Sequence, residues 1–112
     1  MASTSYKTLA QVDLTTTALT TLLTVGAGKE VVISTIIIAN RNASADSFRI
    51  AIQTDGDAIS NSHYIAFDVP VAANDSTTLT LGITMSATDV LSVQATTADR
   101  LSVNVFGAEI TV

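Results

Sequence analysis

The chain has 112 residues, a length that fits one domain with its own hydrophobic core. It contains no cysteine, which excludes disulfides, a thiolate nucleophile and a cysteine-ligated zinc ion. Ten acidic residues against five dispersed basic ones give a net charge of −5, which argues against binding to nucleic acid or to an anionic membrane.

Charged side chains are scarce in this sequence. They make up 13% of the chain, against about 25% in ordinary soluble domains, while apolar residues make up 47%. A small domain exposes much of its surface, so part of this weakly charged surface is expected to be covered by other copies or by partners. Composition therefore points to assembly rather than to catalysis.

No stretch approaches the roughly 20 apolar residues that a transmembrane helix needs. The first residues, MASTSYKTLAQVDL, lack the basic and apolar regions of a secretory signal. We therefore expect synthesis in a cytoplasm and, if the protein acts outside the cell, release by another route such as lysis.

Residues 1–5 are small and polar and are expected to form a flexible or partner-bound N-terminal arm, ahead of a β-sandwich domain over residues 6–112. Residues 6–14 alternate between apolar and polar side chains, which predicts a short strand suited to a sheet edge. Its apolar face is expected to carry Tyr6, Ala10, Val12 and Leu14. A second strand is predicted over residues 18–25, where the threonines favour β structure. Its apolar face is expected to carry Leu19, Leu23 and Val25.

The longest β-branched apolar run covers residues 30–41, EVVISTIIIANR, and follows a glycine turn at residues 26–28. Apolar residues occupy both alternating faces, so the strand is expected to be central to its sheet. Two alternatives remain open: both faces are covered within a sandwich, or one face meets a neighbouring copy. The loops beyond Glu30 and Arg41 are expected to contact partners.

A loop at residues 40–46 precedes a strand over residues 47–54. Its inward side chains are expected to be Phe48, Ile50 and Ile52, and its outward ones Arg49 and Gln53. The sequence Asp55-Gly56-Asp57 is a strong hairpin-turn signal. The next strand covers residues 62–69 and ends before Pro70, because proline cannot donate to a ladder. Its apolar face is expected to carry Ile65, Phe67 and Val69.

Residues 76–84 alternate in the manner of a strand. The inward side chains are expected to be Leu79, Leu81 and Ile83, with threonines outward. After a turn at residues 86–89, strands at 90–96 and 100–106 are expected to form a hairpin through residues 97–99. Gly107 is expected to end that strand before a last short one at residues 108–112. Eight or nine short strands without a helical pattern predict an all-β, single-domain antiparallel β-sandwich that is jelly-roll-like.

The sequence offers no convincing catalytic, cofactor-binding or metal-binding residue, so we expect no enzymatic activity and no cofactor. His63 is the only histidine, and the neighbouring serines and Asp68 form no known motif with it. We expect His63 to lie at a rim or at the edge of the core with a hydrogen-bond partner.

Asp55 and Asp57 are possible oxygen ligands, but the residues after them lack the series that a calcium loop requires. A hairpin turn is the favoured interpretation, and a weak ion at a subunit contact remains an alternative. With only five aromatic residues, an aromatic platform for sugars is not favoured. The candidates for such a platform are Tyr6, Tyr64 and Phe106.

Four segments carry a family resemblance: TLLTVGAGKEVVISTIIIANRN, SFRIAI, HYIAFDVPVAANDSTTLTLGITMSATDVLSV and VFGAEI. Together they resemble small virion structural proteins of tailed bacteriophages, notably those of cyanophages and other aquatic phages. The likeness is one of strand-and-turn pattern over residues 19–112, with glycine at position 26 where the family pattern has proline. It implies a β-sandwich module that binds a shell or tail, often as a trimer, with no catalytic residues to carry over.

The leading hypothesis is a capsid decoration, or cement, protein on the outer shell of a phage head. It implies a homo-oligomer, with a trimer favoured, bound to the major capsid protein or other virion proteins, and a location in the virion after synthesis in the host cytoplasm. The second hypothesis is a tail, neck, baseplate or fibre-attachment component. The third is a glycan-binding module that acts at the host surface.

Overall fold

The computed structural model describes residues 3–80 and 82–112, which form nine strands and two short 3-10 helices. The strands are β1 (Ser3–Asp13), β2 (Thr20–Thr24), β3 (Lys29–Asn40), β4 (Asp46–Gln53), β5 (Tyr64–Val71), β6 (Ser76–Leu79), β7 (Ile83–Met85), β8 (Val90–Ala95) and β9 (Leu101–Thr111). The 3-10 helices η1 (Thr54–Gly56) and η2 (Asn61–His63) lie in the connection between β4 and β5.

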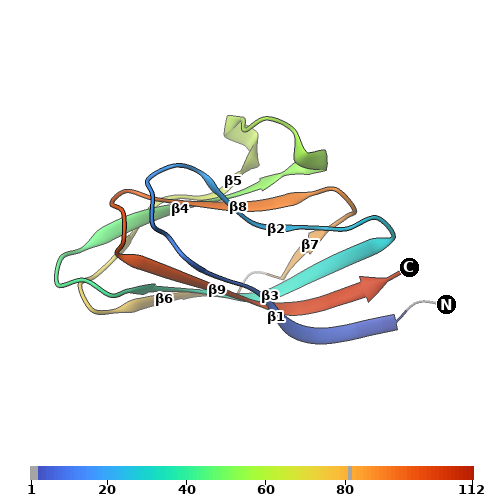
Figure 1. Ribbon diagram of the computed structural model, residues 1–112, viewed down its shortest axis with the longest axis horizontal. Coiled ribbons are helices and arrows are strands. Elements are labelled where there is room, and N and C mark those ends of the chain that lie inside the picture. The colour runs from blue at the N-terminus through green and yellow to red at the C-terminus, as the bar shows by residue number, and fades with distance from the viewer. Residues whose placement is uncertain (1–2, 81) are drawn as a thin grey trace.

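The strands form two antiparallel sheets that face each other across the core (Figure 1). Sheet A has the order β1-β9-β3-β6, with β7 also paired to β3, and sheet B has the order β2-β8-β4-β5. Strands β6 and β7 pair with different halves of β3, so they act as one interrupted strand. When β6 and β7 are counted as one strand, each sheet has four strands, and the connections cross repeatedly from one sheet to the other. This is the arrangement of a jelly roll. The predicted antiparallel β-sandwich is confirmed.

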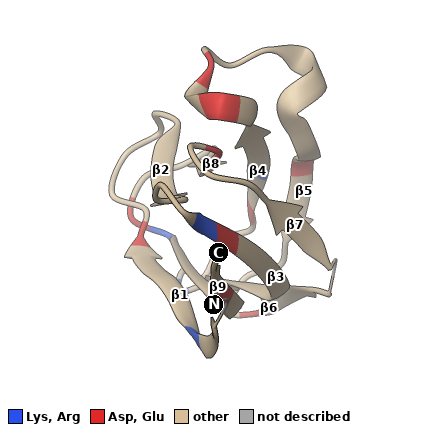
Figure 2. Cartoon of the chain, turned by 90° about the vertical axis from the view of Figure 1, so that its right-hand side faces the viewer, with Lys and Arg blue, Asp and Glu red and all other residues tan. Residues whose placement is uncertain are grey.

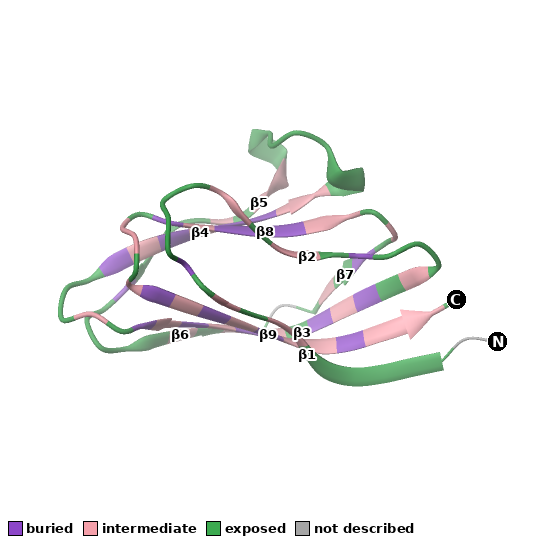
Figure 3. Cartoon of the chain, viewed as in Figure 1, coloured by how far each residue is buried: buried purple, intermediate pink, exposed green. Residues whose placement is uncertain are grey.

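The inner faces of the two sheets supply the hydrophobic core. Alternation places every second side chain of a strand on the same face, and these inward side chains are almost entirely shielded from water. Figure 3 shows the alternation most clearly along β3 and β9. The largest fully buried side chains are Phe48, Leu14, Ile33, Ile36, Ile38, Ile50, Leu91 and Leu101.

Strand β3 is central, as its sequence predicts, with β9 on one side and β6 and β7 on the other. Its inward residues Ile33 and Ile38 have no exposed surface, whereas Val32 and Ile37 on the opposite face are only half-buried. Figure 1 shows sheet A as the lower layer, with no further element of the described chain beneath it. The outer face of β3 is therefore covered by nothing that the described chain supplies.

Bulges in β1 and β5 place side chains on the face opposite to the one that the sequence predicts. The register of β1 against β9 shifts between Thr8 and Ala10, so Tyr6 lies on the opposite face from Ala10 and is exposed. Strand β5 has two irregularities against β4, and Asp68 has a positive φ of 53°. Consequently Phe67 is exposed instead of buried. In the same strand Ile65 is also exposed, which corrects the predicted face, while Val69 packs against the core as expected.

The predicted hairpin between residues 90–96 and 100–106 is wrong. Strand β8 lies in sheet B and β9 in sheet A, so the segment between them crosses from one sheet to the other. The crossing is held by hydrogen bonds from the Thr97 N–H to the Asp46 carboxylate and from the Asp99 N–H to the Leu14 carbonyl. Gly107 does not end a strand either, because β9 continues through it to Thr111.

Three other expectations are revised at their boundaries. Strand β1 begins at Ser3, so residues 3–5 of the expected arm pair with β9, while residues 1–2 lie outside the described residues. Asp55-Gly56 begins a longer connection through η1 and η2 instead of a tight hairpin. Pro70 lies inside β5, which is tolerated at a sheet edge. The expected inward position of Leu81 also lies outside the described residues.

Candidate functional site

Among the described residues, the acidic and histidine side chains do not gather at one site. Among residues 3–80 and 82–112 no group of three or more acidic, histidine or cysteine side chains is placed to hold a metal ion. Within the same residues no helix is long and apolar enough to span a membrane. Charged residues are scattered along the chain (Figure 2).

His63 lies at the end of η2, half-buried, and its Nδ1 accepts a hydrogen bond from the Ser60 N–H at 3.2 Å. The His63 N–H in turn donates to the Ser60 carbonyl at 3.1 Å. The ring thus holds the turn between β4 and β5. The expectation of a rim histidine with a hydrogen-bond partner is confirmed.

Asp55 takes part in a joint between two loops. Its N–H donates to Asp89 Oδ1 at 2.8 Å, and its carboxylate accepts a hydrogen bond from the Thr88 hydroxyl. The other Asp89 oxygen accepts the Ser86 N–H at 2.9 Å. These carboxylates tie the turn after β7 to the connection after β4. Asp57 is exposed and lies beyond this joint.

The outer face of sheet A is the most distinctive surface of the molecule. The register aligns its side chains in five rows across the strands. From the end nearest Thr111 toward the other end, the rows are Thr4-Ile110-Glu30, Tyr6-Ala108-Val32-Thr84, Thr8-Phe106-Thr35, Gln11-Asn104-Ile37-Thr78 and Asp13-Ser102-Ala39-Ser76. Apolar and hydroxyl side chains dominate, and the charged members of these rows, Glu30 and Asp13, lie at opposite ends of the face.

Four of the charged residues on or near this face form two ion pairs. The Lys7 ammonium lies 3.0 Å from a Glu109 carboxylate oxygen, and Arg41 lies 2.5 Å from Asp13 at the other end of β1. Both pairs are partly exposed, so they contribute little to stability. Each pair joins one positive and one negative group, so this face presents no patch of one sign.

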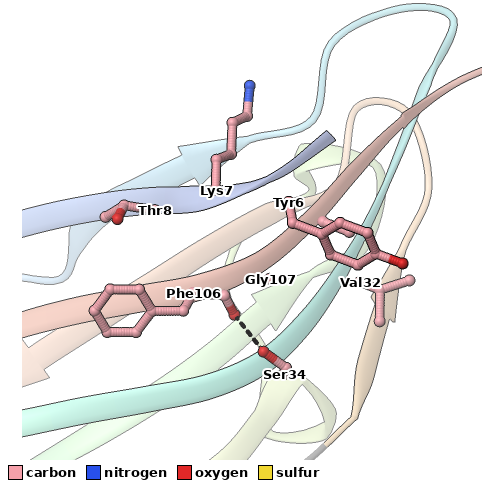
Figure 4. Close-up of a pocket in the computed structure, with 8 residues that line it drawn as sticks. Tyr6, Lys7, Thr8, Val32, Ser34, Phe106 and Gly107 are labelled. Carbon is pink, nitrogen blue, oxygen red and sulfur yellow. Dashed lines mark hydrogen bonds between the residues drawn. The ribbon is translucent and has the colours of Figure 1, made fainter. Parts of the chain in front are cut away.

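A hollow of about 500 Å³ opens on this face, and we call it the sheet-A hollow (Figure 4). The residues that line it are Tyr6, Lys7, Thr8, Val32, Ser34, Phe106, Gly107 and Ala108. Gly107 and Ala108 leave room between the larger side chains of Tyr6 and Phe106. The Ser34 hydroxyl donates to the Phe106 carbonyl at 3.1 Å, which ties the bulged part of β3 to β9.

Tyr6 stands beside the hollow with 86% of its surface exposed. Its backbone is held by pairing with Ala108 in β9, so the exposure does not reflect a loose chain end. Figure 3 shows the exposed N-terminal half of β1 along the edge of sheet A. An aromatic side chain that is ordered by a strand but uncovered is typical of an interface anchor.

A second cluster lies on the other sheet, and we call it the β5 patch: Arg49, Ile59, Tyr64, Ile65, Phe67 and Asp68. The Arg49 guanidinium carbon lies 3.9 Å from the centroid of the Phe67 ring, which meets the Tyr64 ring edge to face at 5.1 Å. Phe67, Ile65 and Ile59 are 54%, 44% and 40% exposed. These side chains form an apolar and aromatic surface around one arginine.

Asp68 fixes that arginine. Its carboxylate accepts hydrogen bonds from Arg49 Nε at 2.6 Å and from Arg49 Nη2 at 3.3 Å. The hydrogen bond from Arg49 is the main cause that lowers the pKa of Asp68. Desolvation of the carboxylate raises the pKa by less, and the positive charge of Arg49 lowers it further. Asp68 itself has a positive φ of 53°.

The structure separates the three aromatic candidates. It brings Tyr6 and Phe106 together at the sheet-A hollow and places Tyr64 in the β5 patch on the other sheet. Phe67 and Val32, which sequence patterns assign to apolar faces, prove to be surface residues of the two clusters. Only the bulges and the sheet order reveal their positions.

No family model matches this chain, and no curated protein matches it. Among solved structures, a chain in the acidic stable capsid structure of Helicobacter pylori bacteriophage KHP30 is similar with a TM-score of 0.50 and 12% identity. The match covers 100% of this chain and 94% of that one. The fold is thus shared with a chain of comparable length in a phage capsid structure.

Two further similarities involve the structures of infectious bursal disease virus. The Gx strain chain has a TM-score of 0.49 and 13% identity over 98% of this chain, and the Gt strain chain has 0.45 and 10% over 97%. This chain spans only about a third of their length, 32% and 31%.

Proposed function

We propose that the protein is a non-enzymatic virion structural protein, and specifically a capsid decoration protein that stabilises the outer shell of a phage head. The observation that carries this proposal is the presence of two separate apolar surfaces on opposite sheets of one small, weakly charged domain. A decoration protein needs such a pair, because it must contact both the shell and its own copies. The capsid-like fold and the family resemblance support the same function.

The β5 patch is the surface that we assign to the shell. Arginine and aromatic residues are enriched at the energetic centres of protein interfaces. Here Asp68 already holds Arg49 over Phe67, so little side-chain entropy is lost when a partner covers the cluster. The cluster lies on edge strand β5, on Arg49 of the neighbouring strand β4 and on the connection between them, where a flat shell surface has access to it.

The outer face of sheet A is then left for contacts between copies, and the family resemblance favours three copies around one axis. Closed symmetry would bury the three uncharged rows of this face and leave the acidic loops in water. A protein that binds the assembled shell but not its free subunits stabilises the shell by mass action. The effect is about 2.7 kcal/mol per site when the free concentration is 100 times the dissociation constant.

Heads with and without the protein test the proposal. Heads that lack it are expected to lose integrity at lower temperature and in low salt, and added protein is expected to restore both. Unchanged stability of the depleted heads, or the absence of this chain from purified heads, would refute the proposal.

A pair of variants locates the shell contact. Phe67→Asp is expected to reduce occupancy on depleted heads at least tenfold, because it places a charge in the β5 patch. Thr15→Asp adds the same charge in the exposed loop between β1 and β2 and is expected to bind as the wild type does. Equal binding of both variants would show that the β5 patch does not face the shell.

A further inference from the structure

We propose that Tyr6 of one copy inserts into the sheet-A hollow of a second copy. This inference deepens the proposed function by naming the contact between copies. It does not require the shell, so it can be tested on the isolated protein.

Tyr6 has the properties of an inserted side chain. It lies in the part of β1 before the bulge, it points to the outer face, and 86% of its surface is exposed. Pairing with Ala108 holds its backbone, so only the two side-chain torsions have to be ordered on binding. A tyrosine buries about 150–250 Å² when it is covered, which makes it a strong candidate for a binding anchor.

The hollow has the properties of a receiving site. Its volume of about 500 Å³ exceeds what one aromatic side chain fills, and Val32 and Phe106 give it apolar walls (Figure 4). The hydroxyls of Thr8 and Ser34 lie at the same hollow and can bond the tyrosine hydroxyl. Ala108, which lies between Tyr6 and Val32 in its row, contributes only a methyl group and so leaves the space open.

Charge identifies a second copy as the occupant. The chain carries a net charge of −5, so two copies repel each other unless they meet through an uncharged surface. The rows of this face hold two charged residues at its opposite ends, Glu30 and Asp13, and Asp13 is paired with Arg41. Lys7 at the hollow is paired with Glu109. An acidic or basic partner would find no complementary patch here, whereas a second copy can cover the three uncharged rows between Glu30 and Asp13.

The outer face of sheet A is also large enough for a stable interface between two copies. The molecule measures 49 × 28 × 20 Å along its principal axes, and Figure 1 views it down the shortest axis with the two sheets stacked vertically. The outer face of sheet A therefore extends over at most 49 by 20 Å. That footprint is comparable to the roughly 800 Å² per partner that a stable interface buries. The same contact made three times in a closed ring would give the trimer that the family resemblance implies.

Light scattering after size-exclusion chromatography gives the first test. The wild type is expected to be oligomeric at tens of micromolar, and Tyr6→Ser is expected to weaken association at least tenfold while its circular dichroism stays unchanged. Phe67→Ser, on the opposite sheet, is the matched control and is expected to associate as the wild type does. A monomeric wild type, or unchanged association of Tyr6→Ser, would overturn the inference.

Cross-linking gives the second test, because the chain has no cysteine of its own. Tyr6→Cys and Val32→Cys variants are mixed in equal amounts and oxidised. We expect the mixed disulfide to exceed both self-paired products, since Tyr6 of one copy would lie against Val32 of the other. A mixed product no more abundant than random pairing predicts would contradict the insertion, even for a protein that oligomerises. A protein that passes both tests but is absent from heads would refute only the proposed function.

Discussion

Gly107 in β9 lies directly against the backbone of Val32 in β3. A Cβ atom at Gly107 would be 2.0 Å from the Val32 carbonyl oxygen and 3.0 Å from Ile33 Cα. The close approach occurs where β3 bulges between Ile33 and Thr35. Glycine is required here by the distance to a neighbouring backbone, not by an unusual φ.

Gly107→Ala is expected to lower the free energy of unfolding by about 1–3 kcal/mol, because the two central strands of sheet A must separate to admit the methyl group. Chemical denaturation of the variant measures the change. Gly26→Ala is the control, since a Cβ there would meet only Lys29 Cγ at 3.6 Å. Equal stability of the two variants would show that the strands are not packed as closely as described.

Asn40 is a buried polar anchor at the end of β3. Its Nδ2 donates to the carbonyls of Ser44, Val71 and Ala72 at 2.9–3.3 Å, and its Oδ1 accepts the Asn42 N–H at 2.9 Å. Asn40→Ala leaves these buried groups without a partner and is expected to cost about 1–3 kcal/mol. Asn61→Ala, at an exposed position in η2, is expected to change stability by less than about 0.5 kcal/mol in the same denaturation experiment. A loss below that level for Asn40→Ala would contradict this role.

The ion pair between Arg49 and Asp68 predicts a pH dependence. The pKa of Asp68 is lower in the folded protein than its ordinary value of 3.8, so the carboxylate stabilises the fold above that pH and the contribution disappears as pH falls through the folded pKa. Comparison of the wild type with Asp68→Asn should show a small stability difference at neutral pH that vanishes in acid. Because the pair is exposed, added salt should reduce this difference. A difference that grows as pH falls would contradict the assignment.

The two faces of β3 predict opposite behaviour for neighbouring isoleucines. Ile36 is 1% exposed, and Ile36→Ala is expected to cost about 2–5 kcal/mol through the cavity that it leaves. Ile37 lies on the outer face and is half-buried, so Ile37→Ala is expected to affect the dilute monomer little but to weaken self-association. Denaturation at low concentration, combined with light scattering at high concentration, separates the two effects. Similar losses of monomer stability would show that the outer face is also part of the core.

Alternation of side chains was sufficient to predict several strands. It identified the inward residues Phe48 and Ile50 of β4, and the apolar residues on both faces of β3 identified its central position. It failed at Tyr6 and Phe67, since one extra residue in a bulge reverses every face beyond it. No local pattern signals such a bulge reliably.

Long-range features could not be predicted from the sequence. The segment between β8 and β9 has a length that suits either a hairpin or a crossing between sheets, and contacts with the distant residues Asp46 and Leu14 decide the outcome. The sheet-A hollow likewise joins Tyr6 to Phe106, which lie at opposite ends of the chain. Composition predicts that some surface is covered, and the register of β1 against β9 places Tyr6 on the outer face of sheet A, which we propose as that surface.

A map of intact particles that contain this chain tests the central claim most directly. The account predicts density for the two-sheet domain on the outside of the head, repeated over the shell, with the β5 patch toward the shell and the outer face of sheet A between neighbouring copies. Density confined to rings in the tail or neck, or no density for this chain in the particle, would contradict it.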